Sequence, residues 1–238
     1  MVRRPRVLVA LVVLAAGCLV ASGAAVARLA DVPAAEVHSA PEPPSDDGPQ
    51  EPGGASGASI SWRASRATGL PWAGRLERGV QLPPEGGEWF TWDPVLLSSP
   101  DRGWRRWGTD ALIRMLLNVL REYRAAHPGA ARVGVGDLSR RFGGPFGARY
   151  GGLGHGSHQN GLDVDVYYPR RDGRERKAFV PEQVDEALAQ DLVDRFVAVG
   201  AIRIFVGPRL HLRGPGRIVR KLVHHDDHLH VRLPRPPE

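Results

Sequence analysis

The sequence predicts an α+β fold in which helices flank a small, mainly antiparallel sheet. Short segments with strand character outnumber the helical segments, and the two kinds do not alternate in the rhythm that a parallel sheet requires. The 238 residues are 42% hydrophobic, which is sufficient for one well-buried domain. We expect this domain over residues 61–238.

Residues 1–27 have the pattern of a signal peptide or a membrane anchor. Three arginines among the first six residues precede an apolar run and the small residues Ala25-Val26-Ala27. The run at 7–27 is also long enough to remain in a bilayer. The single cysteine, Cys18, offers a weaker alternative as a lipid-attachment site. We therefore expect export to the periplasm, the cell wall or the exterior, with membrane contact through this segment alone.

Residues 28–60 predict a disordered linker rich in proline, glycine and acidic residues. Val37 is the one large apolar residue of the stretch 34–59, so this stretch cannot offset the entropy cost of folding. The formal charge of +6 divides into +3 for residues 1–27, −5 for residues 28–60 and +8 for the remainder. A basic exported domain suits anionic cell-wall material rather than nucleic acid, although a solvated arginine-rich surface explains the charge equally well.

Two segments predict helices. The first, "DALIRMLLNVLREYRAAH", follows Thr109 as a suitable N-cap, carries leucines on one face and stops at Pro128-Gly129. The second begins at Pro181 and continues to Gly200, with proline first and glycine last as helix ends prefer.

Five segments predict strands, at residues 132–139, 162–168, 201–207, 217–223 and 228–233. In "LDVDV" the side chains of Asp163 and Asp165 oppose the apolar ones, and in "HLHVRL" His228 and His230 do the same. If the two strands share a sheet, two carboxylates and two imidazoles lie on one surface.

Histidine placement indicates a metal site. Six of the nine histidines lie at 155–158 and 224–230, both beside acidic residues. A hydrolytic zinc site needs three nitrogen or oxygen ligands and one open position, and His158, Asp165 and His230 would supply the ligands. A single His-x-His on a strand is more often a solvated face. The coincidence of two such segments favours the metal site.

Other residues near this group are candidates for proton transfer and for orienting the ligands. His228 or Asp227 would act as the general base, and His225 would relay a proton or donate it to the leaving amine. Ligating histidines need a partner for their second nitrogen, which Asp163 or Asp226 would provide.

The strings "GLGHGSHQNGLDVDVYY" and "HHDDHLHVRL" resemble the penicillin-insensitive murein endopeptidases. This family belongs to the zinc peptidases that include lysostaphin-type enzymes, D-alanyl-D-alanine peptidases and the hedgehog domain. The resemblance extends from residue 81 to residue 233 and includes "GDLSRRFGGPFG" at 136–147.

The resemblance implies a hedgehog-like zinc site on a small antiparallel sheet. It assigns zinc to His158, Asp165 and His230, places His155 at the site as a further histidine, and makes His228 and His225 catalytic. Asp227 departs from the family pattern, whereas the wider group uses a carboxylate three residues before the last ligand as its base. The domain also lacks the paired cysteines of well-known members.

The predicted function is that of an exported zinc endopeptidase that cuts peptidoglycan cross-links between D-alanine and diaminopimelate. Its partners would be peptidoglycan stem peptides, with no nucleic acid. The alternatives are a zinc D,D- or L,D-carboxypeptidase that trims stem peptides, or a zinc- or wall-binding module without catalysis. The sequence assigns neither substrate-binding residues nor an oligomeric state.

Overall fold

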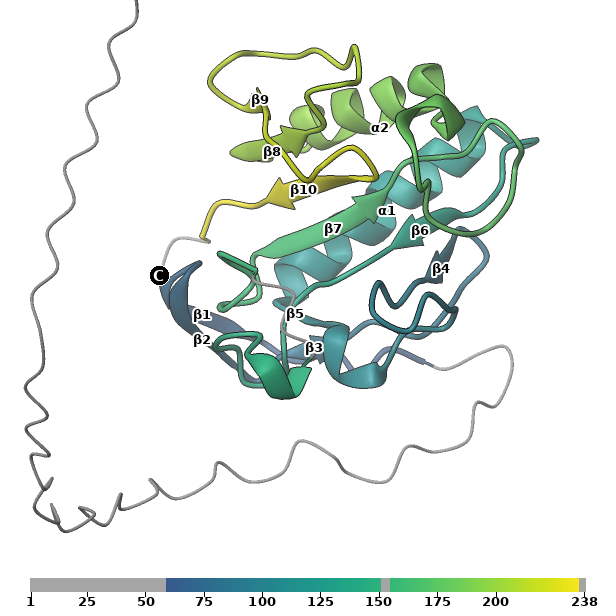
Figure 1. The fold of residues 1–238 in the computed structure, drawn as a ribbon. Coiled ribbons are helices and arrows are strands. Elements are labelled where there is room, and N and C mark those ends of the chain that lie inside the picture. Colours follow the sequence, from purple (N-terminus) through teal and green to yellow (C-terminus); the bar gives the residue numbers. More distant parts are fainter. Residues whose placement is uncertain (1–58, 151–154, 236–238) are drawn as a thin grey trace, which may run out of the picture. The chain divides into compact units, whose positions relative to one another are not determined.

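A six-stranded mixed sheet organises the part of the chain that the computed structural model describes, residues 59–150 and 155–235 (Figure 1). Neighbouring strands pair antiparallel in the centre of the sheet and parallel at its two ends. The order across the sheet is β4 (Trp89–Thr91), β6 (Val133–Val135), β7 (Asp163–Tyr167), β10 (His228–Arg232), β8 (Arg203–Val206) and β9 (Val219–Lys221). The predicted α+β class with a mainly antiparallel sheet is confirmed.

Two small two-stranded sheets are separate from this central sheet. Strand β1 (Arg66–Leu70) pairs antiparallel with β2 (Ala73–Glu77), and β3 (Val80–Gln81) pairs antiparallel with β5 (Trp107–Gly108). These strands were not predicted, because each spans two to five residues and most of their side chains are exposed or half-buried.

Helix α1 (Asp110–Ala126) is confirmed with its predicted cap, since the Thr109 side chain accepts a hydrogen bond from the backbone N–H of Leu112. The predicted start of the second helix at Pro181 is wrong: α2 is Glu186–Ala198. Pro181–Gln183 forms a separate 3-10 turn, η3. Val184 is extended and bridges to Arg170, so the chain re-enters a helix only after Asp185, which caps α2.

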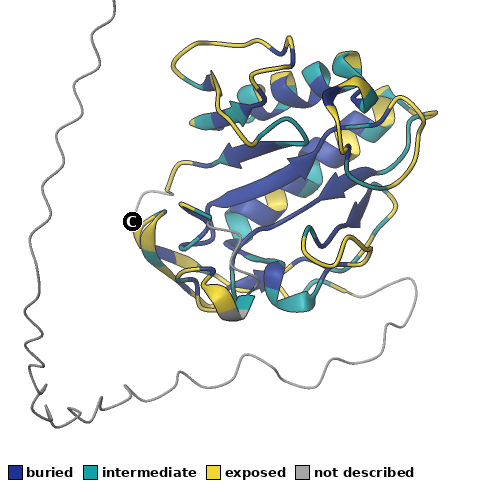
Figure 2. Cartoon of the chain, viewed as in Figure 1, coloured by how far each residue is buried: buried dark blue, intermediate teal, exposed yellow. Residues whose placement is uncertain are grey.

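Both helices cover one face of the sheet, behind the strands in Figure 1. The apolar side chains of β7 and β10 enter the core with those of α1 and α2 and are fully buried; they are Val164, Val166, Leu229 and Val231. Asp163, Asp165, His228 and His230 therefore point to the opposite face, as the alternation predicts. Figure 2 shows β6 and β7 as buried along their length, so the polar face is covered as well.

The predicted signal peptide or anchor at 1–27 lies outside the described residues. So does the predicted linker at 28–60, apart from its last two residues. Two further short 3-10 helices, η1 (Gly103–Arg105) and η2 (Ala148–Tyr150), complete the described elements. Within residues 59–150 and 155–235, no helix has the length and apolar character needed to cross a membrane.

Candidate metal centre

The pairing of β7 with β10 places Asp165 and His230 side by side. The two residues are direct partners in the antiparallel register, and Nδ1 of His230 lies 3.1 Å from Oδ1 of Asp165. Each residue is 5% exposed. Two strand residues separated by 65 positions in the sequence thus meet at the centre of the polar face.

His158 approaches the same point from the loop before β7. Its Nδ1 lies 2.7 Å from the carbonyl oxygen of Leu138, which can only accept, so this nitrogen carries the hydrogen. Its Nε2 lies 3.3 Å from Oδ1 of Asp165 and 3.1 Å from Nδ1 of His230. The backbone of His158 has a φ of +67°, a conformation uncommon outside glycine, and its N–H donates to Asp163 Oδ2 at 3.0 Å.

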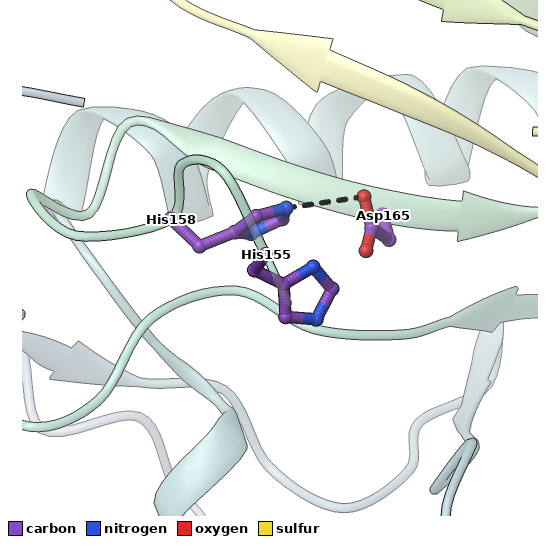
Figure 3. Close-up of side chains that lie close together, drawn as sticks. All are labelled: His155, His158 and Asp165. Carbon is purple, nitrogen blue, oxygen red and sulfur yellow. Dashed lines mark ion pairs between the residues drawn. The ribbon is translucent and has the colours of Figure 1, made fainter. Parts of the chain in front are cut away.

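His155 completes a group whose donor atoms all lie within 4.8 Å of one another, together with His158 and Asp165 (Figure 3). Its ring lies 4.6 Å from the ring of His158 between centroids. The structure therefore brings together all four predicted metal-binding residues, His155, His158, Asp165 and His230.

The donor set fits a divalent cation. Nε2 of His158, Nδ1 of His230 and Oδ1 of Asp165 are separated by 3.1, 3.1 and 3.3 Å. Neighbouring ligands of a tetrahedral zinc ion lie roughly 3.3 Å apart. Because Nδ1 of His158 donates to a carbonyl, the neutral ring turns the lone pair of Nε2 toward Oδ1 of Asp165, which also only accepts when ionised, and toward Nδ1 of His230. A positive charge among these atoms, a proton or a metal ion, relieves their repulsion.

The local charges keep the acidic members of the site ionised. Burial raises the pKa of Asp165, but the neighbouring His158 and His228 outweigh burial and hold the pKa well below its usual range. Asp163 behaves in the same way, since His230, His158 and Arg232, in that order, lower its pKa against the effect of burial. Burial lowers the pKa of His230, but its contacts with the two carboxylates raise that pKa overall.

His228 lies on the same strand face, with Asp227 behind it. Nε2 of His228 lies 3.8 Å from Asp165 Oδ1, and its Nδ1 lies 2.7 Å from Asp227 Oδ1. Lys177 contacts the other carboxylate oxygen of Asp227 at 2.8 Å. Burial raises the pKa of Asp227, but His228 and Lys177 lower it to about 2. His225 lies next, with 4.8 Å between its ring centroid and that of His228.

The two residues predicted to contact the second nitrogen of a ligating histidine, Asp163 and Asp226, lie in different places. Oδ1 of Asp163 is 3.3 Å from Nε2 of His230 and 2.5 Å from Nε of Arg232, so Asp163 is next to a candidate ligand. Asp226 instead accepts a hydrogen bond from the backbone N–H of Arg209 at 3.2 Å. Its predicted role beside a ligand has no supporting contact in the described structure.

Two charged residues at the site, Asp137 and Lys177, were not predicted. Asp137 follows β6, and its Oδ2 lies 2.5 Å from Nε2 of His155. Its position near the end of the predicted strand "RVGVGDLS" was the available signal, because the end of a strand beside "LDVDV" is near the site. Lys177 lies in a loop, and the sequence pattern around it gave no indication of its contact.

Fold and cluster together define an α+β protein with a candidate metal centre on one face of its sheet. The chain belongs to the penicillin-insensitive murein endopeptidase family, whose model matches residues 67–201, more than half of the chain. The match includes His155, His158 and Asp165. It ends before β10, so the placement of His228 and His230 rests on the geometry described above.

Two curated relatives are penicillin-insensitive murein endopeptidases. The protein from Pectobacterium atrosepticum is 32% identical over a region that covers 44% of this chain and 44% of that protein. The protein from Yersinia enterocolitica is 30% identical, over 44% of this chain and 46% of that protein. The alignments thus span less than half the length of either relative.

Proposed function

We propose that this protein is an exported zinc-dependent endopeptidase that hydrolyses peptidoglycan cross-links of the D-alanyl to diaminopimelyl type. The observation that carries the proposal is the convergence of three buried nitrogen and oxygen atoms, from His158, Asp165 and His230, at the spacing of zinc ligands. Membership of the murein endopeptidase family supports peptidoglycan as the substrate class.

The proposed ligands are His158, Asp165 and His230, with His155 beside them. A zinc ion held there would polarise the scissile carbonyl and lower the pKa of a water molecule. Asp163 pairs electrostatically with the second nitrogen of His230 at 3.3 Å, and the carbonyl of Leu138 accepts a hydrogen bond from the second nitrogen of His158 at 2.7 Å. Each ring thereby turns its other nitrogen toward Asp165.

We assign the general base to His228 and the orientation of its ring to Asp227. The pKa of Asp227, lowered to about 2 by His228 and Lys177 against the effect of burial, makes this carboxylate a weak proton acceptor near neutral pH. Nε2 of His228, in contrast, faces Asp165 at 3.8 Å while Asp227 holds Nδ1. We assign proton delivery to the leaving amine to His225, which lies next to His228.

The remaining parts of the proposal rest on the sequence. Residues 1–27 direct export or anchor the chain, residues 28–60 are a linker, and residues 61–238 form the catalytic domain. The domain's formal charge of +8 suits the anionic wall, and we propose no nucleic-acid partner.

The test uses the purified full chain and a peptidoglycan dimer cross-linked from D-alanine to diaminopimelate. Mass spectrometry follows its products before chelation, after chelation and after zinc is restored. We expect conversion of dimer to monomers that stops on chelation and returns with zinc. Undiminished cleavage after complete metal removal would contradict the proposal.

The same experiment separates the alternatives. A carboxypeptidase releases free D-alanine, or shortens the stem, and leaves the cross-link intact. A binding module gives no new product, and the substitution His228→Gln does not change its retention on peptidoglycan. Under the proposed function, His228→Gln retains zinc and lowers turnover by about 10²–10⁴-fold.

A further inference from the structure

Asp137 joins the loop that carries His155 to the central strand β7. Its backbone carbonyl accepts a hydrogen bond from the N–H of Asp165 at 2.8 Å, while its side-chain Oδ2 lies 2.5 Å from Nε2 of His155. Gly136 permits this approach, because a Cβ there would lie only 3.2 Å from the Cβ of Asp165. Asp137 is 1% exposed, so its carboxylate is an interior group.

Arg105 fixes the other oxygen of this carboxylate. The Arg105 side chain is fully buried, and its Nη1 contacts Oδ1 of Asp137. Its Nε lies 3.5 Å from Oδ2 of Asp93, and its guanidinium stacks 4.6 Å from the ring centroid of Trp104. An arginine can only donate, so Oδ1 of Asp137 is committed to Arg105 and Oδ2 is left for His155.

The contact with Asp137 determines which nitrogen His155 presents to the site. An ionised carboxylate only accepts hydrogen bonds, so Nε2 of His155 must be the donor and the neutral ring has its lone pair on Nδ1. Figure 3 shows one ring nitrogen of His155 on the side facing His158 and Asp165 and the other on the far side. Phe146 packs edge-on against the ring at 5.0 Å between centroids, which restricts its rotation.

We infer that Asp137, held by Arg105, is a positioning residue that fixes His155 in the tautomer with its lone pair on Nδ1, directed at the proposed metal site. The inference rests on the proposed function and deepens it. Asp137 acts through His155, as carboxylates behind ligating histidines do.

The first test measures the tautomer directly in the unaltered, metal-free full chain. Nitrogen-15 NMR at mildly alkaline pH distinguishes a protonated ring nitrogen from one with a lone pair, and His155→Gln identifies the signals of His155. We expect the hydrogen on Nε2. A hydrogen on Nδ1 overturns the inference without any change to Asp137.

The second test is Asp137→Asn. Its amide oxygen must face Arg105, so its NH₂ group faces His155 and donates to Nε2. The hydrogen of the ring then moves to Nδ1, where it blocks the lone pair. We expect the reversed tautomer and zinc affinity lower by about 10–100-fold, measured by competition with a chromophoric chelator.

The matched control is Asp93→Asn, which alters another buried carboxylate beside the same Arg105. Asp93 lies 3.5 Å from Arg105 and contacts Arg102 and the backbone of its own loop. We expect this variant to keep the wild-type tautomer of His155 and wild-type zinc affinity. An equal loss of affinity in both variants assigns the effect to the Arg105 network and overturns the positioning role.

Coupling between the two residues distinguishes positioning from general support. In the background of His155→Ala, Asp137→Asn should produce no further loss of zinc affinity. A full additional loss overturns the inference. A chain that binds zinc with the expected tautomer but cleaves no muropeptide contradicts the proposed function alone, whereas cleavage with an unchanged tautomer in Asp137→Asn contradicts this inference alone.

Discussion

The ammonium group of Lys177 lies 2.8 Å from Oδ2 of Asp227, whose other oxygen lies 2.7 Å from Nδ1 of His228. Cation, carboxylate and imidazole thus form a row that ends near Asp165, 3.8 Å beyond Nε2 of His228. Burial lowers the pKa of His228, but Asp165 and Asp227 raise it overall. Lys177 reduces the rise in the pKa of His228 that Asp227 causes, because the positive charge of Lys177 partly compensates the carboxylate.

Lys177→Met should therefore move the acidic limb of the pH profile of kcat/KM. Without the ammonium group, Asp227 attracts the proton of His228 more strongly and the pKa of His228 rises further. The neutral base then prevails only at higher pH, so the limb shifts upward by up to about one unit. Lys221→Met is the matched control, since the exposed Lys221 contacts the carbonyl of Pro208. An unchanged acidic limb in Lys177→Met would refute the proposed effect of Lys177 on the pKa of His228.

Asp227→Asn should reduce turnover while leaving zinc in place. Lys177 requires the amide oxygen, so the NH₂ group faces Nδ1 of His228 and moves the ring hydrogen to Nε2, the nitrogen that must accept a proton. We expect kcat to fall by about 10²–10⁴-fold, as when the carboxylate behind a catalytic histidine becomes an amide. Metal content and single-turnover rates on the cross-linked dimer measure the two effects.

Asp226→Asn provides the comparison for that experiment. Asp226 is adjacent in the sequence, but it accepts a hydrogen bond from the backbone of Arg209. We expect a much smaller loss of kcat than for Asp227→Asn. Equal losses of kcat would show that the contact between Asp227 and His228 makes no specific contribution to turnover.

Alternation within two short segments was sufficient to predict one face of the site. Strand side chains alternate strictly, so the burial of Val164 and Val231 fixes Asp165 and His230 on the other face. That the two strands are neighbours, with His230 opposite Asp165, depends on pairing over 65 residues. From the sequence, the carboxylates and imidazoles were expected on one surface only if the two strands share a sheet. In the structure the two strands do pair.

The rest of the site depends on contacts that no local pattern records. Asp137 reaches His155 because β6 pairs with β7 and the residues that follow β6 continue alongside Asp165. Lys177 reaches Asp227 across 50 residues from an irregular loop. The start of α2 was wrongly predicted at Pro181, because proline suits the first turn of a 3-10 helix as well as that of an α-helix.

Zinc binding should release protons near neutral pH. The carboxylates beside His230 raise its pKa above the ordinary value of 6.5, so part of the metal-free protein carries a proton on this ring at pH 7. Zinc needs the neutral ring and must displace that proton, so affinity should rise with pH through this window and release should vanish above it. Calorimetry in buffers of different ionisation enthalpy measures the release. An enthalpy that is independent of buffer at neutral pH would contradict this role of His230.

Thr109→Ala should lower the stability of the fold without weakening the metal site. The Thr109 hydroxyl caps α1 by accepting from Leu112 N–H at 3.1 Å, and its removal should cost about 1 kcal/mol of unfolding free energy. The backbone N–H of Thr109 donates to Gly161 in the loop after His158, and this bond survives the substitution. Thr109→Ser, which keeps the hydroxyl, should unfold close to the wild type. Denaturant midpoints and zinc affinity test the pair, and a parallel loss of affinity in Thr109→Ala would mean that the cap itself holds the loop of His158.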